Sequence, residues 1–185
     1  MAEIIKTKNR RIFTKIPAPG TSVLFKNIQK NESRSMHGQI PIAWSKAENF
    51  NIYDISGNKF IDFTSTIFVS NTGHSNSRIK KYILKSLKNN FLHSYAYIHE
   101  LRNLYLKKLI KFVGNGLDKA FLMSAGTEAT EAAFKLMRMH GKKIKKRKLG
   151  IICLEGNWHG RTMAAQMMSG DYKQKEWIGD LDKNN

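Results

Sequence analysis

Two short stretches of the sequence carry residues whose types and spacing could do chemistry. The first is residues 124–129, Ser-Ala-Gly-Thr-Glu-Ala, which breaks an apolar run and opens a helical pattern. The first N–H groups of a helix have no partner, and the helix dipole favours negative charge there, so this turn could bind an anion such as a phosphate. Gly126 stands where a backbone could approach a ligand closely. The same residues fit a helix start with no ligand, and taken alone they favour that alternative.

The second stretch is residues 155–162, Glu-Gly-Asn-Trp-His-Gly-Arg-Thr. It follows the short apolar run 149–154, which has the character of a parallel strand covered on both faces. A polar and aromatic cluster just beyond the carboxyl end of a strand is where open α/β sheets place ligands. Trp158 could equally be a core aromatic at a strand end, and Arg161 could form a surface salt bridge.

The elements that would position these stretches alternate. Residues 119–123 predict a strand, 127–140 a helix with one apolar face, 149–154 a second strand and 162–168 a short helix. This order is an α/β signature with a mostly parallel sheet flanked by helices. Two parallel strands do not make an independently stable sheet, so we expect the chain to be the N-terminal part of something longer.

Upstream of this region the sequence predicts a β-hairpin over residues 52–63, because Ser-Gly-Asn at 56–58 can supply the positive φ of a tight turn. Helices are expected over 21–30, from about 77 and over 100–112, the last ended by Gly114. Residues 1–20 are interpreted as an arm with little core, residues 64–73 as irregular, and residues 171–185 as polar without a core role.

The composition excludes some function classes. The 185 residues carry a formal net charge of +18, which invites a nucleic-acid hypothesis. The cations are scattered, however, and the dense run 142–148, expected beyond the end of a helix, has no interleaved aromatic residues. Such a run is typical of a solvated surface stretch, so a nucleic-acid partner is not expected.

Compartment and membrane signals are weak. The single cysteine, Cys153, lies in an apolar run and is predicted to be buried. It cannot form an internal disulfide, which fits a reducing compartment. The sequence has no long apolar stretch and no signal-peptide pattern, so cytoplasm is the default expectation, and no membrane partner or metal site is expected.

The sequence resembles the N-terminal part of a class III aminotransferase, of the fold-type I group that uses pyridoxal 5′-phosphate. Four segments carry this resemblance over residues 40–170. Residues 53–62 are similar to the family's early hairpin, and Asn-Thr-Gly-His at 71–74 to the Gly-His before its first large-domain helix. Residues 124–129 resemble its phosphate-binding turn, and Trp-His-Gly-Arg-Thr at 158–162 its aromatic-His-Gly-Arg-Thr segment. Any one match is weak, but the four in order are specific.

The resemblance implies roles for matching residues. Gly126 and Thr127 would bind the cofactor phosphate through backbone N–H groups and the threonine hydroxyl. Trp158 would lie against the pyridine ring, where the family commonly has Phe or Tyr, and His159 would have a supporting role below the cofactor. Arg161 matches a position that receives a substrate carboxylate in several members, for which a guanidinium fork is well suited.

The resemblance also predicts what the chain lacks. The family's Schiff-base lysine and the aspartate that pairs with the pyridine nitrogen lie downstream of the matched segments, and no lysine of this sequence matches the lysine's context. We therefore expect a truncated transaminase, inactive alone and a homodimer when full length, with an amino acid or amine and a keto acid or aldehyde as substrates. Residues 1–70 would form an N-terminal arm and hairpin segment, and residues 71–185 an incomplete cofactor-binding large domain.

Two alternatives stay open. One is a non-catalytic basic binding module associated with nucleic acid. The other is a different phosphate-binding α/β protein, although a nucleotide P-loop is disfavoured because Gly126 is followed by Thr127 and not by the lysine that a P-loop needs.

Overall fold

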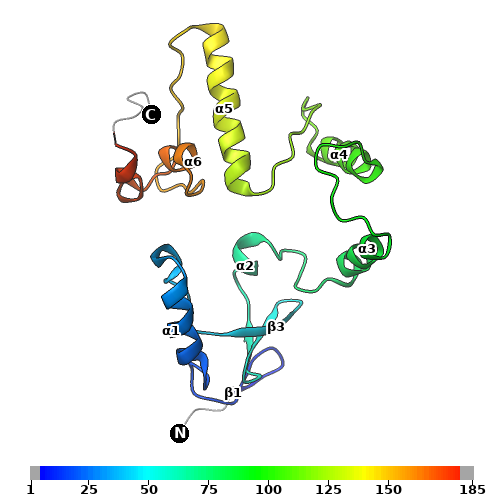
Figure 1. Ribbon diagram of the computed structural model, residues 1–185, viewed down its shortest axis with the longest axis vertical. Helices are drawn as coiled ribbons and strands as arrows, with labels where there is room; N and C mark the ends of the chain where they lie inside the picture. The colour runs from blue at the N-terminus through cyan, green and yellow to red at the C-terminus, as the bar shows by residue number, and fades with distance from the viewer. Residues whose placement is uncertain (1–4, 180–185) are drawn as a thin grey trace. The chain divides into compact units, whose positions relative to one another are not determined.

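The computed structural model describes residues 5–179 and divides into two compact units (Figure 1). The first unit ends at Tyr97 and the second begins at Ile98. This division reflects compactness alone, so the expected segment boundary between residues 70 and 71 stays a prediction. Each unit is described by itself.

The first unit is built on a five-stranded antiparallel sheet in the order β1-β2-β5-β4-β3. The predicted hairpin is confirmed: β4 and β5 pair antiparallel, with Ile52 opposite Phe60 and Tyr53 opposite Lys59. A register shift interrupts the β3–β4 pairing between Trp44 and Lys46. The strands are β1 (Ile5–Lys6), β2 (Arg11–Ile12), β3 (Trp44–Glu48), β4 (Asn51–Asp54) and β5 (Lys59–Ile61).

A buried carboxylate holds the hairpin turn. The Asp54 side chain accepts hydrogen bonds from the backbone N–H groups of Ser56 and Asn58, each at 2.9 Å, and from Asn58 Nδ2 at 2.7 Å. Asp54 and Asn58 are 2% and 0% exposed. Gly57 lies between them at φ +80°, the left-handed region that glycine enters without strain. The turn therefore closes around polar groups that satisfy one another.

The expectation that residues 1–20 form an arm with little core is wrong for the part that the structure describes. β1 and β2 extend the sheet, and Ile12 and Ala18 are buried. The side chain of Asn58 accepts hydrogen bonds from the backbone N–H groups of Phe13, at 2.6 Å, and Thr14, at 3.2 Å. Strands of two residues have no periodic pattern, so the sequence carries little signal for them.

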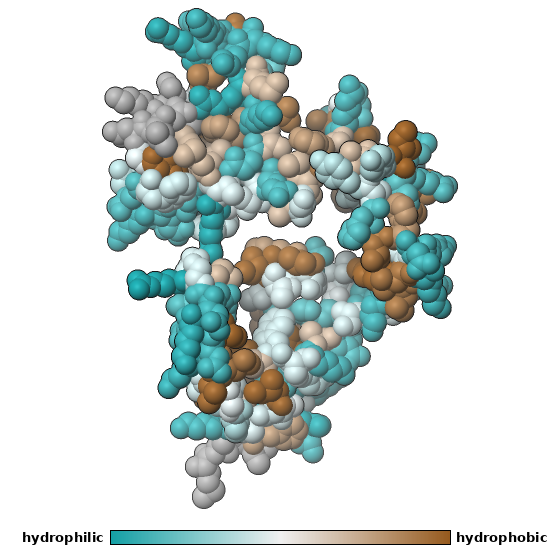
Figure 2. Space-filling model, viewed as in Figure 1, coloured by the Kyte–Doolittle hydropathy of each residue, from teal (hydrophilic) through white to brown (hydrophobic). Residues whose placement is uncertain are grey.

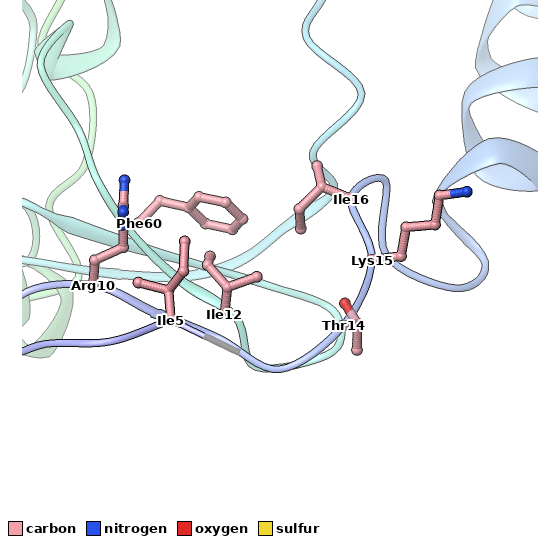
Figure 3. Close-up of a pocket in the computed structure, with 7 residues that line it drawn as sticks. All are labelled: Ile5, Arg10, Ile12, Thr14, Lys15, Ile16 and Phe60. Carbon is pink, nitrogen blue, oxygen red and sulfur yellow. The ribbon is translucent and has the colours of Figure 1, made fainter. Parts of the chain in front are cut away.

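A pocket of about 340 Å³ lies on the sheet of the first unit (Figure 3). Ile5, Ile12 and Phe60 provide apolar lining, and the Lys15 side chain points away from them in the close-up. A ligand site usually combines an apolar wall with polar groups that converge on one point. The Lys15 ammonium group points away from the apolar wall, so we propose no ligand site in this pocket.

Helices of the first unit follow the sequence well, except at one turn. The helix expected from about residue 77 is confirmed, and its N-cap Asn76 accepts hydrogen bonds from the N–H groups of Arg78 and Ile79. Residues 65–68 form an unexpected turn whose φ values lie between +49° and +68°, a left-handed conformation that costs energy for side chains such as Ile67. The helices are α1 (Thr21–Asn31), the 3-10 helix η1 (Arg34–Met36), α2 (Ser65–Phe68) and α3 (Ser77–Lys88).

The second unit is helical in its described part. The helices expected over 100–112, from 127 and over 162–168 are all present, and α5 contacts α6 (Figure 1). They are α4 (Glu100–Val113), α5 (Gly126–Ile144), α6 (Met163–Met167) and the 3-10 helix η2 (Tyr172–Ile178).

The expected end of α5 near Gly141 is wrong, since the helix continues to Ile144 and includes the first lysines of the basic run. Gly141 does not terminate the helix, because its φ is not positive. It is buried instead where the backbone carbonyl of Lys148 passes so closely that a side chain would not fit.

The two parallel strands expected at 119–123 and 149–154 are absent from the described structure, which contains only the small antiparallel sheet. Both stretches are extended chain without strand pairing. Cys153, expected to be buried, is exposed. A strand is defined by hydrogen bonds to a neighbour. An apolar run in the sequence can therefore predict a strand, but it does not show that a neighbouring strand is present to pair with it.

Residues 171–179 correct another expectation, because they have a core role. Ile178 is buried, and Trp177 Nε1 donates a hydrogen bond to Gln166 Oε1 in α6 at 2.6 Å. Residues 180–185, for which the same expectation was made, lie outside the described residues. In the described chain, no helix is both long enough and apolar enough to cross a membrane.

Many large apolar side chains are exposed on the surface of each unit. Figure 2 shows hydrophobic side chains gathered over α2 and α3. Ile79, Ile83 and Leu84, whose helical spacing predicts the apolar face of α3, are about half exposed. In the second unit a groove of about 870 Å³ is lined mainly by apolar residues of 121–123, α5 and α6, and the charged residues Glu128, Glu131, Lys135 and Arg138 also form part of its wall. Exposed surfaces of this size are typical of faces that another surface covers.

Candidate functional site

The amino end of α5 presents free N–H donors. Its N-cap, Ala125, is extended and makes no side-chain capping bond. The N–H groups of Gly126, Thr127 and Glu128 precede the first intrahelical bond, which Ala129 N donates to Ala125 O at 3.0 Å. No atom lies within 4 Å of the position that a Cβ on Gly126 would occupy. The turn therefore has room for a ligand against its backbone, as the sequence predicts.

One carboxylate already lies at this helix end. The backbone N–H of Ser124 donates to Glu128 Oε2 at 2.9 Å, which closes the turn in front of the helix. The carboxylate is in the first turn, where the helix dipole stabilises it. A phosphate bound at this helix end would lie near the negative charge of Glu128. Its binding would therefore depend on hydrogen bonds from the N–H groups of Gly126 and Thr127, which precede Glu128 in the chain.

The loop that contains Trp158 and Arg161 meets α5 at Gly160. Gly160 is buried and has φ +132°, and a Cβ built on it would overlap the side chain of Thr127. Only glycine fits such a contact in this conformation. The structure thus brings the two stretches singled out in the sequence together, with Thr127 of one against Gly160 of the other.

A second contact between loop and helix was missed from the sequence. The hydroxyl of Thr162 donates a hydrogen bond to Glu131 Oε1, and the same oxygen accepts from the backbone N–H of Ala165 at 3.2 Å. In the sequence Glu131 is only a second acid, after Glu128, near the start of this helix. A usable signal was present, since Thr127 and Glu131 are spaced i, i+4 and share one face of a helix.

His159 is held by its own loop and by α6. Its Nε2 lies 3.0 Å from Asn157 Nδ2, and its backbone N–H donates to Ser169 Oγ at 3.3 Å. Ser169 is buried and its hydroxyl donates to Ala165 O at 2.9 Å. These contacts fix the position of His159 without giving it a reacting partner within the described residues.

Trp158 and Arg161 lie against each other. The guanidinium carbon of Arg161 is 5.7 Å from the centre of the Trp158 ring, within cation–π range. Trp158 is 53% exposed in this chain. An aromatic ring with an accessible face can stack on a flat ligand.

The first unit holds a separate buried pair. His74 Nε2 and Asp62 Oδ2 are 2.7 Å apart, and Asp62 Oδ1 accepts from Thr64 N, Thr64 Oγ1 and Ser65 N. Burial raises the pKa of Asp62, but hydrogen bonds from His74, Thr64 and Ser65 outweigh it and lower the pKa from 3.8 to about 2. Among the described residues, no group of three His, Cys, Asp or Glu side chains could hold a metal ion.

Comparison with known proteins identifies the family. The family described as aminotransferase class-III matches residues 33–182. An acetylornithine aminotransferase from Clostridium acetobutylicum is 32% identical over 153 residues, which cover 80% of this chain and 38% of that protein. A mitochondrial ornithine aminotransferase from Oryza sativa subsp. japonica is 30% identical over 164 residues, covering 87% of this chain and 34% of that protein.

Solved structures agree. The ornithine aminotransferase from Toxoplasma gondii ME49 matches with a TM-score of 0.77 at 21% identity, over 89% of this chain and 39% of that one, which shows the fold alone. The acetylornithine aminotransferase from Elizabethkingia anophelis matches with a TM-score of 0.65 at 27% identity, over 84% of this chain and 38% of that one. The chain spans less than two fifths of the length of these relatives. It belongs to the class III aminotransferases, a family that uses pyridoxal 5′-phosphate.

Proposed function

We propose that this chain supplies one wall of the cofactor site of a transaminase, which moves an amino group between an amino donor and a keto acid or aldehyde. The observation that carries the proposal is the contact between Thr127 and Gly160. It joins a helix end suited to an anion with a loop that presents an accessible aromatic face. Pyridoxal 5′-phosphate contains both an anion and a flat ring, and when bound it supplies the electron sink for the transfer.

The proposed cofactor contacts come from the amino end of α5 and from the loop at Trp158. The N–H groups of Gly126 and Thr127, with the Thr127 hydroxyl, bind the phosphate, because they lie at the positive end of α5. Trp158 lies against one ring face and excludes water from it. His159 supports this loop through its bonds to Asn157 and Ser169. The open space at Gly126 and the accessible indole fit such a cofactor.

Arg161 is proposed to receive a substrate carboxylate. Its guanidinium lies over Trp158, so the same indole that faces the cofactor also orients the cation. A guanidinium pairs with a carboxylate through two parallel hydrogen bonds. The relatives are named for acetylornithine and ornithine, both amino acids. For this chain we propose an amino acid or amine as donor, without choosing between them.

Three further proposals concern the whole protein. No lysine of the chain matches the context of the family's Schiff-base lysine, so we propose that this chain alone does not transaminate. We propose a homodimer for the complete enzyme. Cytoplasm remains the proposed compartment, although some relatives are named as mitochondrial, a location stated of those proteins only.

The proposal is tested with pyridoxine 5′-phosphate, which has the ring and phosphate but no aldehyde and therefore cannot react with the chain's many lysines. The chain is labelled with 5-fluorotryptophan, and its three tryptophan resonances are assigned with single Trp→Phe variants. We expect a saturable shift of the Trp158 resonance, with Trp44 as the unaffected reference. Pyridoxine, which lacks the phosphate, should bind at least about tenfold more weakly.

Gly160→Ala is the matched variant, because its added methyl group displaces the loop from Thr127. It should abolish the saturable shift, whereas Gly38→Ala, at a glycine with open space around it, should not. Equal shifts with pyridoxine and pyridoxine 5′-phosphate would refute a phosphate site at α5.

A further inference from the structure

We propose that Glu131 is a positioning residue that fixes the loop of residues 157–162, together with α6, against the amino end of α5. The consequence for cofactor binding rests on the proposed function above, but the positioning itself does not. The carboxylate does this by accepting hydrogen bonds from Thr162 and Ala165.

Two contacts set the register between helix and loop. Thr127 and Glu131 are one turn apart on α5 and lie on the same face. Their partners in the loop, Gly160 and Thr162, are two residues apart and follow the same order along the loop as Thr127 and Glu131 do along α5. A single contact would let the loop pivot about Gly160. The second contact, at Glu131, removes that freedom.

The same carboxylate caps α6 from outside. Thr162 is the N-cap of α6, yet its hydroxyl makes no capping bond within that helix, because it donates to Glu131 instead. Glu131 then accepts from Ala165 N, one of the first N–H groups that α6 leaves without an intrahelical partner. A helix of five residues is too short to be stable by itself, so an external cap matters to it.

The loop and α6 form one closed piece. Gly170 N donates to Asn157 O at 3.2 Å, and Ser169 links His159 N to Ala165 O. Gly170 also lies so close to the backbone of Gly156 that no side chain would fit. Because both ends of this piece are tied together, the position of α6 determines the position of Trp158.

Glu131 has no Lys or Arg partner among the salt bridges of the described residues. Its charge lies at the amino end of α6, where the helix dipole is positive, so capping and electrostatic attraction act together. This separates Glu131 from Glu128, whose carboxylate closes the turn at Ser124. Glu128 therefore stabilises the turn before α5, whereas Glu131 contacts the loop and α6.

The test uses the full chain labelled with 5-fluorotryptophan, first without ligand and far from the urea unfolding midpoint. We expect Glu131→Ala and Thr162→Val each to shift or broaden the Trp158 resonance, and the double variant to resemble Glu131→Ala, because Glu131→Ala already removes the bond that Thr162→Val removes. Glu131→Gln and Thr162→Ser keep an acceptor and a hydroxyl and should retain the wild-type spectrum.

Ile178→Ala is the matched control for stability. It removes a buried side chain of η2, outside the closed piece of residues 156–170, and should lower the urea midpoint while leaving the Trp158 resonance in place. A role limited to stability would make Glu131→Ala behave in the same way. An unmoved Trp158 resonance in Glu131→Ala would therefore overturn the proposal.

A titration with pyridoxine 5′-phosphate separates this inference from the proposed function. Glu131→Ala should weaken binding by about tenfold, the scale of one hydrogen bond to a charged group, and Glu131→Gln should largely restore it. Unchanged affinity in Glu131→Ala would contradict the role in cofactor binding. If the wild-type chain binds no pyridoxine 5′-phosphate, the proposed function fails, and the ligand-free spectra still decide whether Glu131 positions the loop.

Discussion

The antiparallel sheet of the first unit and the apolar stretches of the second differ in how far the chain completes them. In the sheet, Asp54 and Asn58 are almost fully buried, and Asn58 also binds the backbone of residues 13–14. In the second unit Ile152 and Leu154 are 99% and 80% exposed, and the stretch 149–154 pairs with no strand in the described chain.

The difference shows what each kind of sheet requires. Antiparallel strands can be joined by tight turns, so β4 and β5 find their partners a few residues away. Parallel strands need crossover connections and neighbours from elsewhere in a chain. The chain spans less than two fifths of its relatives' length. Its described part contains a complete hairpin, but the stretches 119–123 and 149–154, which were expected to be parallel strands, have no strand to pair with.

The largest expected effect comes from Asn58→Ala. The change removes the acceptor for the N–H groups of Phe13 and Thr14, in part-buried bonds, and a donor to the buried Asp54 carboxylate. Groups left unsatisfied there should cost about 3 kcal/mol or more of the free energy of unfolding of the first unit. Urea unfolding followed at Trp44, in β3, measures this loss of stability.

Asn27→Ala, at an exposed position of α1, is the control and should change stability by less than about 0.5 kcal/mol. An unaltered midpoint for Asn58→Ala would show that the turn network is not what holds the sheet.

Two isoleucines, one in each unit, allow the sheet and the stretch 149–154 to be compared with the same substitution. Ile52 is 5% exposed in β4, and Ile152 is almost fully exposed. Ile52→Ala should destabilise the first unit by about 3 kcal/mol, since it leaves a cavity. Ile152→Ala should change the stability of the second unit by less than about 0.5 kcal/mol. Urea titrations read at Trp44 and at Trp158 provide both values. A large cost at Ile152 would mean that the stretch 149–154 is packed in solution.

The smallest expected effect is a pH dependence confined to the first unit. The folded-state pKa of Asp62 is depressed to about 2 from 3.8, so the ionised carboxylate stabilises the folded unit. This contribution is fully present above the unfolded-state value and is lost as the pH falls through about 2.

Wild type should therefore lose its stability advantage over Asp62→Asn as the pH is lowered through this window. The resonance of Trp158, in the second unit, should not report the difference. Parallel pH profiles for wild type and Asp62→Asn would contradict the assignment of the shift to the bonds from His74, Thr64 and Ser65.

Much of this architecture could be predicted because its causes are local. The hairpin rests on Ser-Gly-Asn in a turn, and α3, α4 and α5 rest on helical spacing and helix-end residues. The anion-suited turn at Gly126 and the loop at Trp158 were found because each stands at the end of an apolar run. The family resemblance, drawn from four short segments, is confirmed over residues 33–182.

The remainder depends on contacts between distant residues, which spacing does not encode. Pairing of Arg11 with Lys59 makes β2 a strand, although its two residues show no pattern. Gly141 looks like a helix terminator, but its lack of a side chain instead admits the backbone of Lys148. Glu131 looks like one more acid near a helix start, and only the position of Thr162 gives it a role. The proposed ligand roles of Gly126, Thr127, Trp158, His159 and Arg161 stay predictions.

The central claim is that the amino end of α5 and the loop at Trp158 form one wall of a pyridoxal phosphate site. Amide NMR of the chain during titration with pyridoxine 5′-phosphate tests it most directly. The claim predicts saturable shifts and slower hydrogen exchange for the N–H groups of Gly126 and Thr127, together with a shift of the Trp158 indole at the same ligand concentration. Unmoved amide resonances at Gly126 and Thr127 under saturation, or a response at Trp158 without them, would contradict it.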